Sequence, residues 1–322
     1  IGVDNDPLTE QGAEAIEGLD FIQVDIQNPL FVELLKNEKV HTVCHLDFSH
    51  QYHRSEKAFV ENVLGTMKLV GACAEAGVRK LVFKSSTMVY GATWSNPAFL
   101  TETHPIQGSK GYGYTRDMVE IESFCTGFCQ QSPDMIITRL RFPGIIGPRS
   151  ETPMNQYLGL KLIPVLIGFD PMMQVIHESD VIQALVHAVE NDIPGTFNVA
   201  AEGVLPLRGI IGRVGKLPLP IFHPFAYVAS DMISMSRLPI SKTSPIEWDY
   251  LRYRWVADLN RMREEFGFVP QHSAQEALAD LARHQKLSHF NEERADYIRD
   301  EAYLQEIISQ RNRLRVGDGE QK

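Results

Sequence analysis

Short apolar runs alternate with longer stretches of helical periodicity through the first half of the chain. The runs are compact and rich in β-branched residues, as is typical of strands buried on both faces of a sheet. Between them, apolar residues recur at the spacing of a helix face. This alternation predicts an α/β fold, a doubly wound parallel sheet with right-handed crossovers. The predicted strands are Phe21–Val24, Val40–Leu46, Lys80–Phe83 and Met135–Leu140, and the predicted helices lie between Phe59 and Val70 and between Met118 and Phe128.

The regular alternation weakens after Gly147, where proline and methionine become frequent. A strand–helix–strand pattern returns at Gln174–His177, Val181–Val189 and Thr196–Val199, and a second proline-rich passage follows. We therefore predict one larger domain from residues 1–148 and about 174–200, and a smaller, discontinuous C-terminal lobe from about 149–173 and 201–280. Residues 281–322 have helical periodicity and dense charge, which predicts a charged helical tail.

Composition narrows the possible partners. The 322 residues carry a formal net charge of -10, which disfavours nucleic acid and anionic membrane surfaces as partners. The most apolar stretch, Phe222–Met235, is interrupted by His223, Pro224 and Asp231, so we expect no membrane span. No signal-peptide pattern opens the sequence, and we expect a cytoplasmic protein.

The four cysteines each lie inside an apolar stretch, at Cys44, Cys73, Cys125 and Cys129. This placement is typical of reduced core thiols, and the spacing between the last two is rare in zinc sites without further ligands nearby. We expect no bound metal.

The first candidate for chemistry is Asp4, which ends the apolar run Ile1–Asp4. In a dinucleotide-binding fold an acidic residue at the end of the second strand accepts the ribose hydroxyls, and the glycine-rich phosphate loop lies roughly 20 residues upstream. That distance places the loop before Ile1, and no Gly-x-Gly-x-x-Gly pattern occurs between a strand and a helix later on. We therefore expect the sequence to begin within a dinucleotide-binding domain.

Four further segments, in this order, carry a family resemblance: Phe21–Ile26, Val40–Leu46, Glu61–Thr66 and Lys84–Gly91. The chain resembles extended short-chain dehydrogenase/reductases of the NAD-dependent epimerase/dehydratase type from Ile1 to about Pro270. The resemblance implies a Rossmann-like NAD-binding domain formed by the larger part of the chain. It also implies that helices Phe59–Val70 and Met118–Phe128 pair with those of a second copy, giving a homodimer.

The resemblance assigns cofactor contacts residue by residue. Asp4 would hold the ribose, which favours NAD over NADP, and Asp25 would contact the adenine amine with help from the Ile26 backbone. The family usually has two small residues where this chain has Asp47 and Phe48. The full set of implied cofactor-binding residues is Asp4, Asp25, Ile26, Leu46, Asn62, Tyr112, Arg116 and Pro143.

The catalytic residues implied by the resemblance are Ser86, Tyr112 and Arg116. The family motif Tyr-x-x-x-Lys matches Tyr112–Arg116, with arginine in the position of lysine. Helical spacing of four would put both side chains on one face, where a cation lowers the pKa of the tyrosine from its ordinary value of about 10. Ser86 would hydrogen-bond the substrate oxygen while Tyr112 moves its proton.

Departures from the family pattern narrow the reaction. Thr87 and Met88 stand where nucleotide-sugar dehydratases have an acid pair, which disfavours dehydration. Gly144 replaces a sugar-contacting asparagine and Met173 replaces an arginine aimed at the diphosphate, which disfavours a UDP-sugar.

We therefore interpret the chain as an NAD-dependent enzyme that transfers hydride at a carbonyl or secondary alcohol of a small-molecule substrate. One alternative is a UDP-sugar 4-epimerase-like isomerase. Another is a non-catalytic NAD-binding or redox-sensing module, which Arg116 and Asp47 would favour. We interpret His177 as a buried structural residue and Asp180 as a helix cap before Val181.

Overall fold

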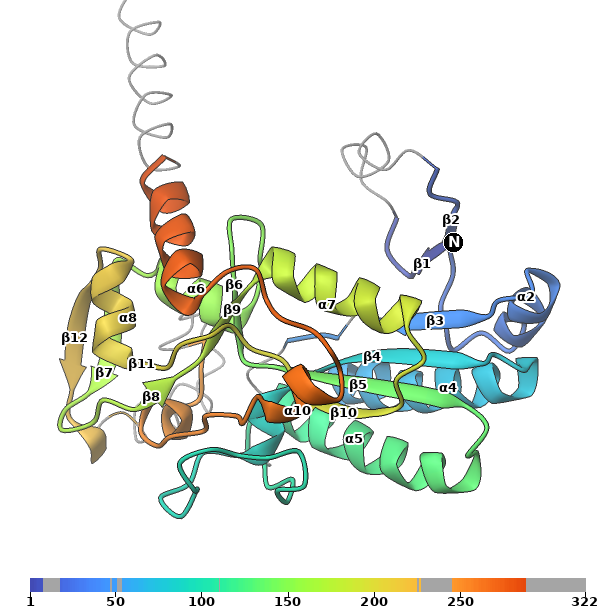
Figure 1. The fold of residues 1–322 in the computed structure, drawn as a ribbon, viewed down its shortest axis with the longest axis horizontal. Coiled ribbons are helices and arrows are strands. Elements are labelled where there is room, and N and C mark those ends of the chain that lie inside the picture. Colours follow the sequence, from blue (N-terminus) through green and yellow to red (C-terminus); the bar gives the residue numbers. More distant parts are fainter. Residues whose placement is uncertain are drawn as a thin grey trace, which may run out of the picture.

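A four-stranded parallel sheet forms the centre of the larger part of the molecule, with strand order β10-β5-β4-β3. The computed structural model describes residues 1–7, 18–46, 48–50, 54–109, 111–224, 226 and 245–287. The strands are β3 (Thr42–His45), β4 (Lys80–Ser86), β5 (Ile136–Phe142) and β10 (Gly195–Asn198). Helix α7 (Glu178–Glu190) lies on one side of this sheet, and α4 (Gly65–Ala76) and α5 (Gly113–Gln131) lie on the other (Figure 1).

The predicted parallel sheet with helices on both faces is confirmed. All but one residue of β4 is buried, because helices cover both faces of this central strand. The strands differ from the prediction at their ends: β4 and β5 each extend past their predicted last residue, to Ser86 and Phe142. This extension brings polar residues to the carboxyl edge of the sheet.

The N-terminal segment forms a second, two-stranded parallel sheet from β1 (Gly2–Asp4) and β2 (Phe21–Gln23). The backbone N–H of Val24 donates to the carbonyl oxygen of Asp4 at 2.9 Å, which keeps the two segments paired past the strand ends. Helix α2 (Phe31–Asn37) follows and packs against α4.

The first predicted helix is a continuous helical segment of three parts. It runs through α3 (Glu56–Phe59), a π-helical turn (Val60–Leu64) and α4, and ends at Gly77, whose φ of 74° is the left-handed conformation that favours glycine. π-helical turns are rare and are frequent at functional sites. Here the turn contains Asn62, one of the predicted cofactor contacts.

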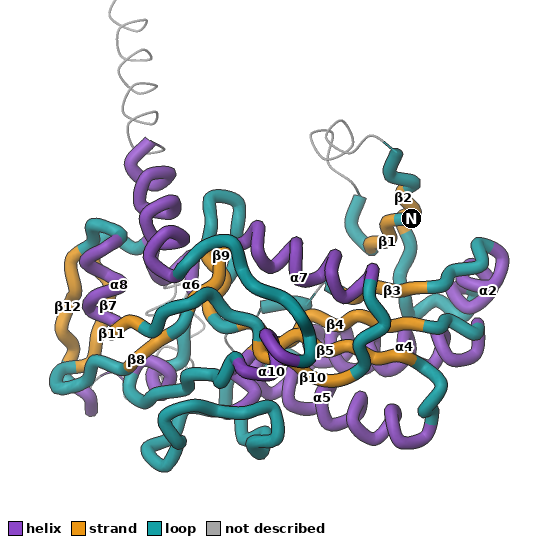
Figure 2. Tube along the Cα trace, viewed as in Figure 1, coloured by secondary structure: helices purple, strands orange, loops and turns teal. Residues whose placement is uncertain are grey.

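The proline- and methionine-rich passages form small two-stranded sheets and short helices beside the main sheet (Figure 2). One core cluster contains buried residues from both parts, such as Phe83 and Trp255, so the two parts pack as one body. The elements are β6 (Gly144–Ile146) with β9 (Val175–His177), β7 (Leu162–Leu166) with β12 (Leu217–Ile221), β8 (Met172–Met173) with β11 (Leu205–Pro206), α6 (Pro153–Gly159), α8 (Leu207–Arg213), a 3-10 turn (Trp248–Leu251), α10 (Asn260–Glu264) and a helix over 274–287. The residue boundaries proposed for the two domains stay a prediction.

The interpretation of Asp180 as a helix cap is wrong. His177 is the N-cap of α7 and accepts from the backbone N–H of Ser179, whereas Asp180 lies inside the first turn. The buried Asp180 carboxylate instead accepts backbone N–H groups of Gln271 and His272, at 2.9 and 3.1 Å. Its role is still structural, because it ties the loop before the helix over 274–287 to α7.

Part of the predicted tail and one unusual position lie outside the described residues. These are residues 288–322 and Asp47. Among the residues that are described, no helix is both long and apolar enough to cross a membrane.

Candidate functional site

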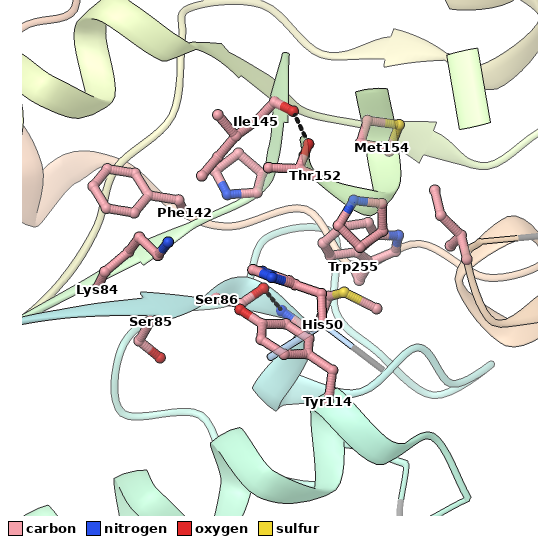
Figure 3. A pocket seen from close by; sticks show the side chains of 15 residues that line it. His50, Lys84, Ser85, Ser86, Tyr114, Phe142, Ile145, Thr152, Met154 and Trp255 are labelled. Carbon is pink, nitrogen blue, oxygen red and sulfur yellow. Dashed lines mark hydrogen bonds between the residues drawn. The ribbon is translucent and has the colours of Figure 1, made fainter. Parts of the chain in front are cut away.

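A cavity opens at the carboxyl ends of β4 and β5, which is the edge where ligands bind in parallel α/β sheets (Figure 3). Its lining mixes a few polar side chains with a mostly apolar wall. The lining residues are His50, Lys84, Ser85, Ser86, Met88, Tyr114, Phe142, Pro143, Gly144, Ile145, Thr152, Pro153, Met154, Ile246 and Trp255.

Ser86 is placed at the cavity because it ends β4 and caps the 3-10 turn Thr87–Tyr90 that follows. Its hydroxyl oxygen accepts from the backbone N–H of Met88 at 3.2 Å, which fixes the side chain. The turn ends at Gly91, with φ of 74°, where an added Cβ would lie 2.6 Å from the carbonyl oxygen of Gln107. A glycine is therefore required for the loop over 107–108 to return along this turn.

Tyr114 reaches the cavity from the first turn of α5 and is buried, with 6% of its surface exposed. The loop before α5 approaches the helix closely, since an added Cβ on Gly108 would lie 2.6 Å from the Thr115 side chain. Burial raises the pKa of Tyr114, and a hydrogen bond with the Ser86 hydroxyl offsets part of this rise. At neutral pH Tyr114 is therefore a protonated hydrogen-bond donor.

Two basic side chains also line the cavity, His50 and Lys84. The imidazole of His50 stacks on the ring of Tyr114, with centroids 4.4 Å apart and planes 28° apart. Lys84 lies on β4 and contributes positive charge: burial and then the Lys84 charge lower the pKa of nearby His45 to about 4. His45 is consequently neutral, and it contacts Thr66 rather than the cavity.

Tyr112 and Arg116 bind different partners, although their spacing predicts that they act together. Tyr112 is the N-cap of α5 and has an extended backbone, with φ of -93° and ψ of 122°. Its buried hydroxyl donates to the carbonyl oxygen of Pro245 at 2.9 Å. Neither Tyr112 nor Arg116 is among the described residues that line the cavity with Ser86.

Arg116 is bound to the adjacent carboxylate instead. Its Nε and Nη2 atoms donate to the Asp117 carboxylate at 2.9 and 2.6 Å, and its guanidinium lies over the ring of Phe59. Asp117 is buried and also accepts from the Asn62 side chain at 3.0 Å, while Asn62 binds the backbone of Ser49. This network holds the segment before His50 against α5.

The remaining predicted cofactor residues lie at carboxyl ends of parallel strands. Asp4 ends β1, Asp25 follows β2 closely, and Leu46 directly follows β3. The exposed Asp25 carboxylate accepts from the backbone N–H of Gln27 at 2.8 Å, and Ile26 is half-buried beside it. Two carboxylates at adjacent strand ends suit the hydroxyl and amine groups of an adenosine, so the residues present fit a dinucleotide.

The structure shows what surrounds the two residues that depart from the family pattern on the substrate side, Gly144 and Met173. An added Cβ on Gly144 would lie 2.7 Å from the Met154 side chain, so Met154 fills the space that a larger residue at this position would need. Met173 is 1% exposed within the main core cluster, so it has no contact with solvent where an arginine would bind a phosphate. Trp255 and Ile246 close the cavity from the C-terminal part of the chain.

Sequence reasoning missed Tyr114, Lys84 and Trp255. Tyr114 lies inside the Tyr112–Arg116 motif, and Lys84 directly precedes the two serines Ser85 and Ser86. Both residues could therefore have been considered from the sequence. Trp255 reaches the cavity from a segment that no local pattern connects with it. Of the predicted residues, Ser86 and Pro143 line the cavity.

Residues 1–200 match the model of a protein family described as the NAD dependent epimerase/dehydratase family. An uncharacterized protein of Mycobacterium tuberculosis is 34% identical over 268 residues, which cover 82% of this chain and 71% of the relative.

Solved structures share the fold at lower identity. MoeE5 in complex with UDP-glucuronic acid and NAD has a TM-score of 0.65 and 21% identity, over 89% of this chain and 90% of MoeE5. A UDP-glucose 4-epimerase from Thermotoga maritima with UDP-glucose has a TM-score of 0.65 and 18% identity, over 89% of this chain and 90% of that protein.

Proposed function

We propose that this chain, which belongs to the NAD-dependent epimerase/dehydratase family, transfers hydride at a carbonyl or secondary alcohol of a small molecule bound beside Ser86. The observation that carries the proposal is the cavity itself, where Ser86 and Pro143 lie with a buried tyrosine at the carboxyl edge of the sheet. A hydroxyl pair of this kind can hold a carbonyl oxygen and exchange a proton with it.

We propose NAD as the cofactor. Asp4 would hold the ribose and disfavour a 2′-phosphate, and Asp25 with the Ile26 backbone would hold the adenine. Leu46, which directly follows β3, and Asn62, which binds the backbone of Ser49, would line the path from the adenosine end toward Ser86. When bound, the nicotinamide supplies or accepts the hydride. The protein then needs only to orient the substrate and to move one proton.

The cavity wall supports a substrate with an apolar face. Met88, Phe142, Met154 and Trp255 form much of the wall, and the described lining includes one lysine and no arginine. A diphosphate is usually bound by arginine in a bidentate manner. We therefore propose an aromatic or branched ketone, or the corresponding alcohol, as the substrate class.

A UDP-sugar 4-epimerase reaction is the second candidate. It is favoured by solved structures of similar fold in complex with UDP-glucose or UDP-glucuronic acid. The buried Met173 and the space occupied by Met154 beside Gly144 speak against it.

A substrate panel tests these proposals directly. Purified protein is incubated with NAD or NADH and with aromatic ketones, their alcohols, hydroxy acids or UDP-sugars, and cofactor absorbance and products are measured. We expect NADH oxidation with an aromatic ketone. Interconversion of UDP-glucose and UDP-galactose without it would favour the epimerase, whereas cofactor binding without any turnover would favour the non-catalytic module.

We also propose that the protein forms a homodimer in the cytoplasm. The four cysteines are free, which suits a reducing compartment. Val60 and Leu64 expose 42% and 40% of their surface on the helical segment predicted to pair with a second copy. Sedimentation at micromolar concentration should show a dimer that a Val60→Glu, Leu64→Glu double variant converts to monomer. The matched control Ile182→Glu, on the exposed face of α7, should leave the dimer intact.

A further inference from the structure

Tyr112 and Tyr114 lie two positions apart where α5 begins, and their hydroxyl groups have different surroundings. The motif Tyr112–Arg116 points to Tyr112 as the residue that moves a proton. In the structure the Tyr112 hydroxyl is 2.9 Å from the carbonyl oxygen of Pro245, and only 2% of the residue is exposed. A hydroxyl that donates its hydrogen to a buried carbonyl has none to give to a substrate in that geometry.

The cation expected beside Tyr112 is also bound elsewhere. Arg116 uses two nitrogen atoms on the Asp117 carboxylate, at 2.9 and 2.6 Å. Asp117 is 1% exposed, and among the described residues only the Asn62 amide would still donate to its carboxylate if Arg116 moved away. Withdrawing one partner from a buried charge pair is costly, so this pairing resists rearrangement.

Tyr114 has the contacts that Tyr112 lacks. It lines the cavity and contacts Ser86, which is itself fixed at the end of β4 by the backbone N–H of Met88 (Figure 3). The His50 imidazole stacks on its ring, which restricts the ring orientation. Lys84 supplies a positive charge to the same cavity.

We propose that Tyr114, rather than Tyr112, is the catalytic residue that exchanges the proton with the substrate oxygen, with Ser86 as its partner and Lys84 as the cation of the cavity. This inference rests on the proposed hydride-transfer function. In the reducing direction a bound reduced nicotinamide would supply the hydride to the carbonyl carbon. The carbonyl electron pair would move to oxygen, and that oxygen would take the proton of the Tyr114 hydroxyl. The O–H bond of Tyr114 breaks as the O–H bond of the alcohol forms, and the resulting phenolate recovers a proton from solvent.

The surroundings favour Tyr114 as a proton donor. Burial raises its pKa and the Ser86 hydrogen bond lowers it again in part, so the hydroxyl keeps its proton at neutral pH. A residue that starts protonated suits reduction of a ketone better than oxidation of an alcohol. The Lys84 ammonium would stabilise the negative charge that develops on the two oxygens, because opposite charges attract.

The first test compares three variants in ketone reduction. Tyr114→Phe should lower kcat by about a hundredfold to ten-thousandfold with little change in KM, as is typical when a general acid is removed. Tyr112→Phe is the matched comparison, since it removes the same atom from the same turn, and it should keep kcat within about threefold of wild type. Lys84→Met should lower kcat and Lys84→Arg should restore part of it. The reverse ranking of the two tyrosine variants would overturn the inference.

The second test reads the tyrosines without turnover. In protein labelled isotopically at tyrosine Cζ, the resonances of Tyr112 and Tyr114 are assigned from their disappearance in the Phe variants. Acetophenone is then added to the protein with NAD. The Tyr114 resonance should shift and the Tyr112 resonance should not, and Ser86→Ala should change the Tyr114 resonance before any ketone is added.

The two tests separate failure of this inference from failure of the proposed function. If no ketone is reduced but acetophenone shifts only Tyr114, the site assignment stands and the proposed reaction is wrong. If ketones are reduced while acetophenone shifts only Tyr112, or neither tyrosine, the proposed reaction stands and the assignment of Tyr114 is overturned.

Discussion

Two groups of polar residues on and beside α5 are satisfied in different ways. Tyr112, Arg116 and Glu122 bind the protein's own carbonyl and charged groups, whereas Tyr114 and Ser86 line a cavity. The difference shows that a motif names residue types but does not determine which of them reach the site. Closed polar networks maintain the structure, and the groups left facing a cavity are the ones available to a substrate.

The largest expected effect lies in the closed network at Glu122. Its carboxylate is fully buried and binds Arg141 at 2.8 and 2.9 Å and the Ser85 hydroxyl at 2.6 Å. Burial alone would raise the pKa of Glu122, but the hydrogen bonds and charge of Arg141 lower it below its ordinary value. Glu122→Ala should lower the free energy of unfolding by about 3–5 kcal/mol, because Arg141 stays buried without its partner.

The measurement for Glu122 is urea unfolding at neutral pH, with Glu120→Ala on the exposed face of α5 as the control. The control should change stability by less than about 0.5 kcal/mol. Equal effects of the two variants would mean that the closed network at Glu122 does not stabilise the fold.

A pH-dependent effect should appear at Glu247, which belongs to the segment that Tyr112 contacts through Pro245. Burial raises the pKa of Glu247 to about 7, while a hydrogen bond with Ser109 opposes the rise. The unfolded chain therefore loses this proton at lower pH than the folded protein, so stability should fall as pH rises from about 4.5 to 7. Glu247→Gln removes that loss, which the pKa difference sets at about 3 kcal/mol.

Thermal unfolding across this pH range tests the sign. The stability of wild type relative to Glu247→Gln should be highest at the acid end and should decrease toward neutral pH. A difference that stays constant, or that grows with pH, would contradict the burial of this carboxylate.

A moderate effect is expected at Arg116, where the two interpretations of the motif disagree. If Arg116 positions Asp117, Arg116→Met should cost about 1–3 kcal/mol of stability and leave kcat nearly unchanged. If it is the motif cation beside Tyr112, the same variant should lose kcat at unchanged stability, and Arg116→Lys should keep or raise activity. Measuring unfolding and ketone reduction on both variants decides between them.

The smallest expected effect concerns the wall of the cavity that Ser86 and Tyr114 line. A methyl group added at Gly144 would contact Met154 at 2.7 Å, so Gly144→Ala should cost about 1 kcal/mol and should reduce the space for a ketone. A double-mutant cycle with Met154→Ala should give a favourable coupling of at least about 0.5 kcal/mol. Additive effects would show that the two side chains do not share this space.

The sheet was predictable because burial on both faces leaves a local trace. The apolar runs that became β4 and β5 were visible in the sequence, and the prediction failed only at their ends, where Ser86 and Phe142 continue the strands. Polar residues such as Lys84 and Ser85 interrupted the pattern because their partners come from α5 and from the cavity. The polar residues of the site therefore made the ends of these strands difficult to predict from the sequence.

The sequence by itself determined the order of strands and helices and the family resemblance, because both depend on short-range patterns. Only the tertiary structure decided which tyrosine faces the cavity. That choice depends on where α5 begins and on the segment after residue 244, whose Pro245 carbonyl accepts from Tyr112 across 133 positions of sequence. A contact between residues so far apart leaves no periodic trace in either segment, so the selection of Tyr114 over Tyr112 appears only when the chain is folded.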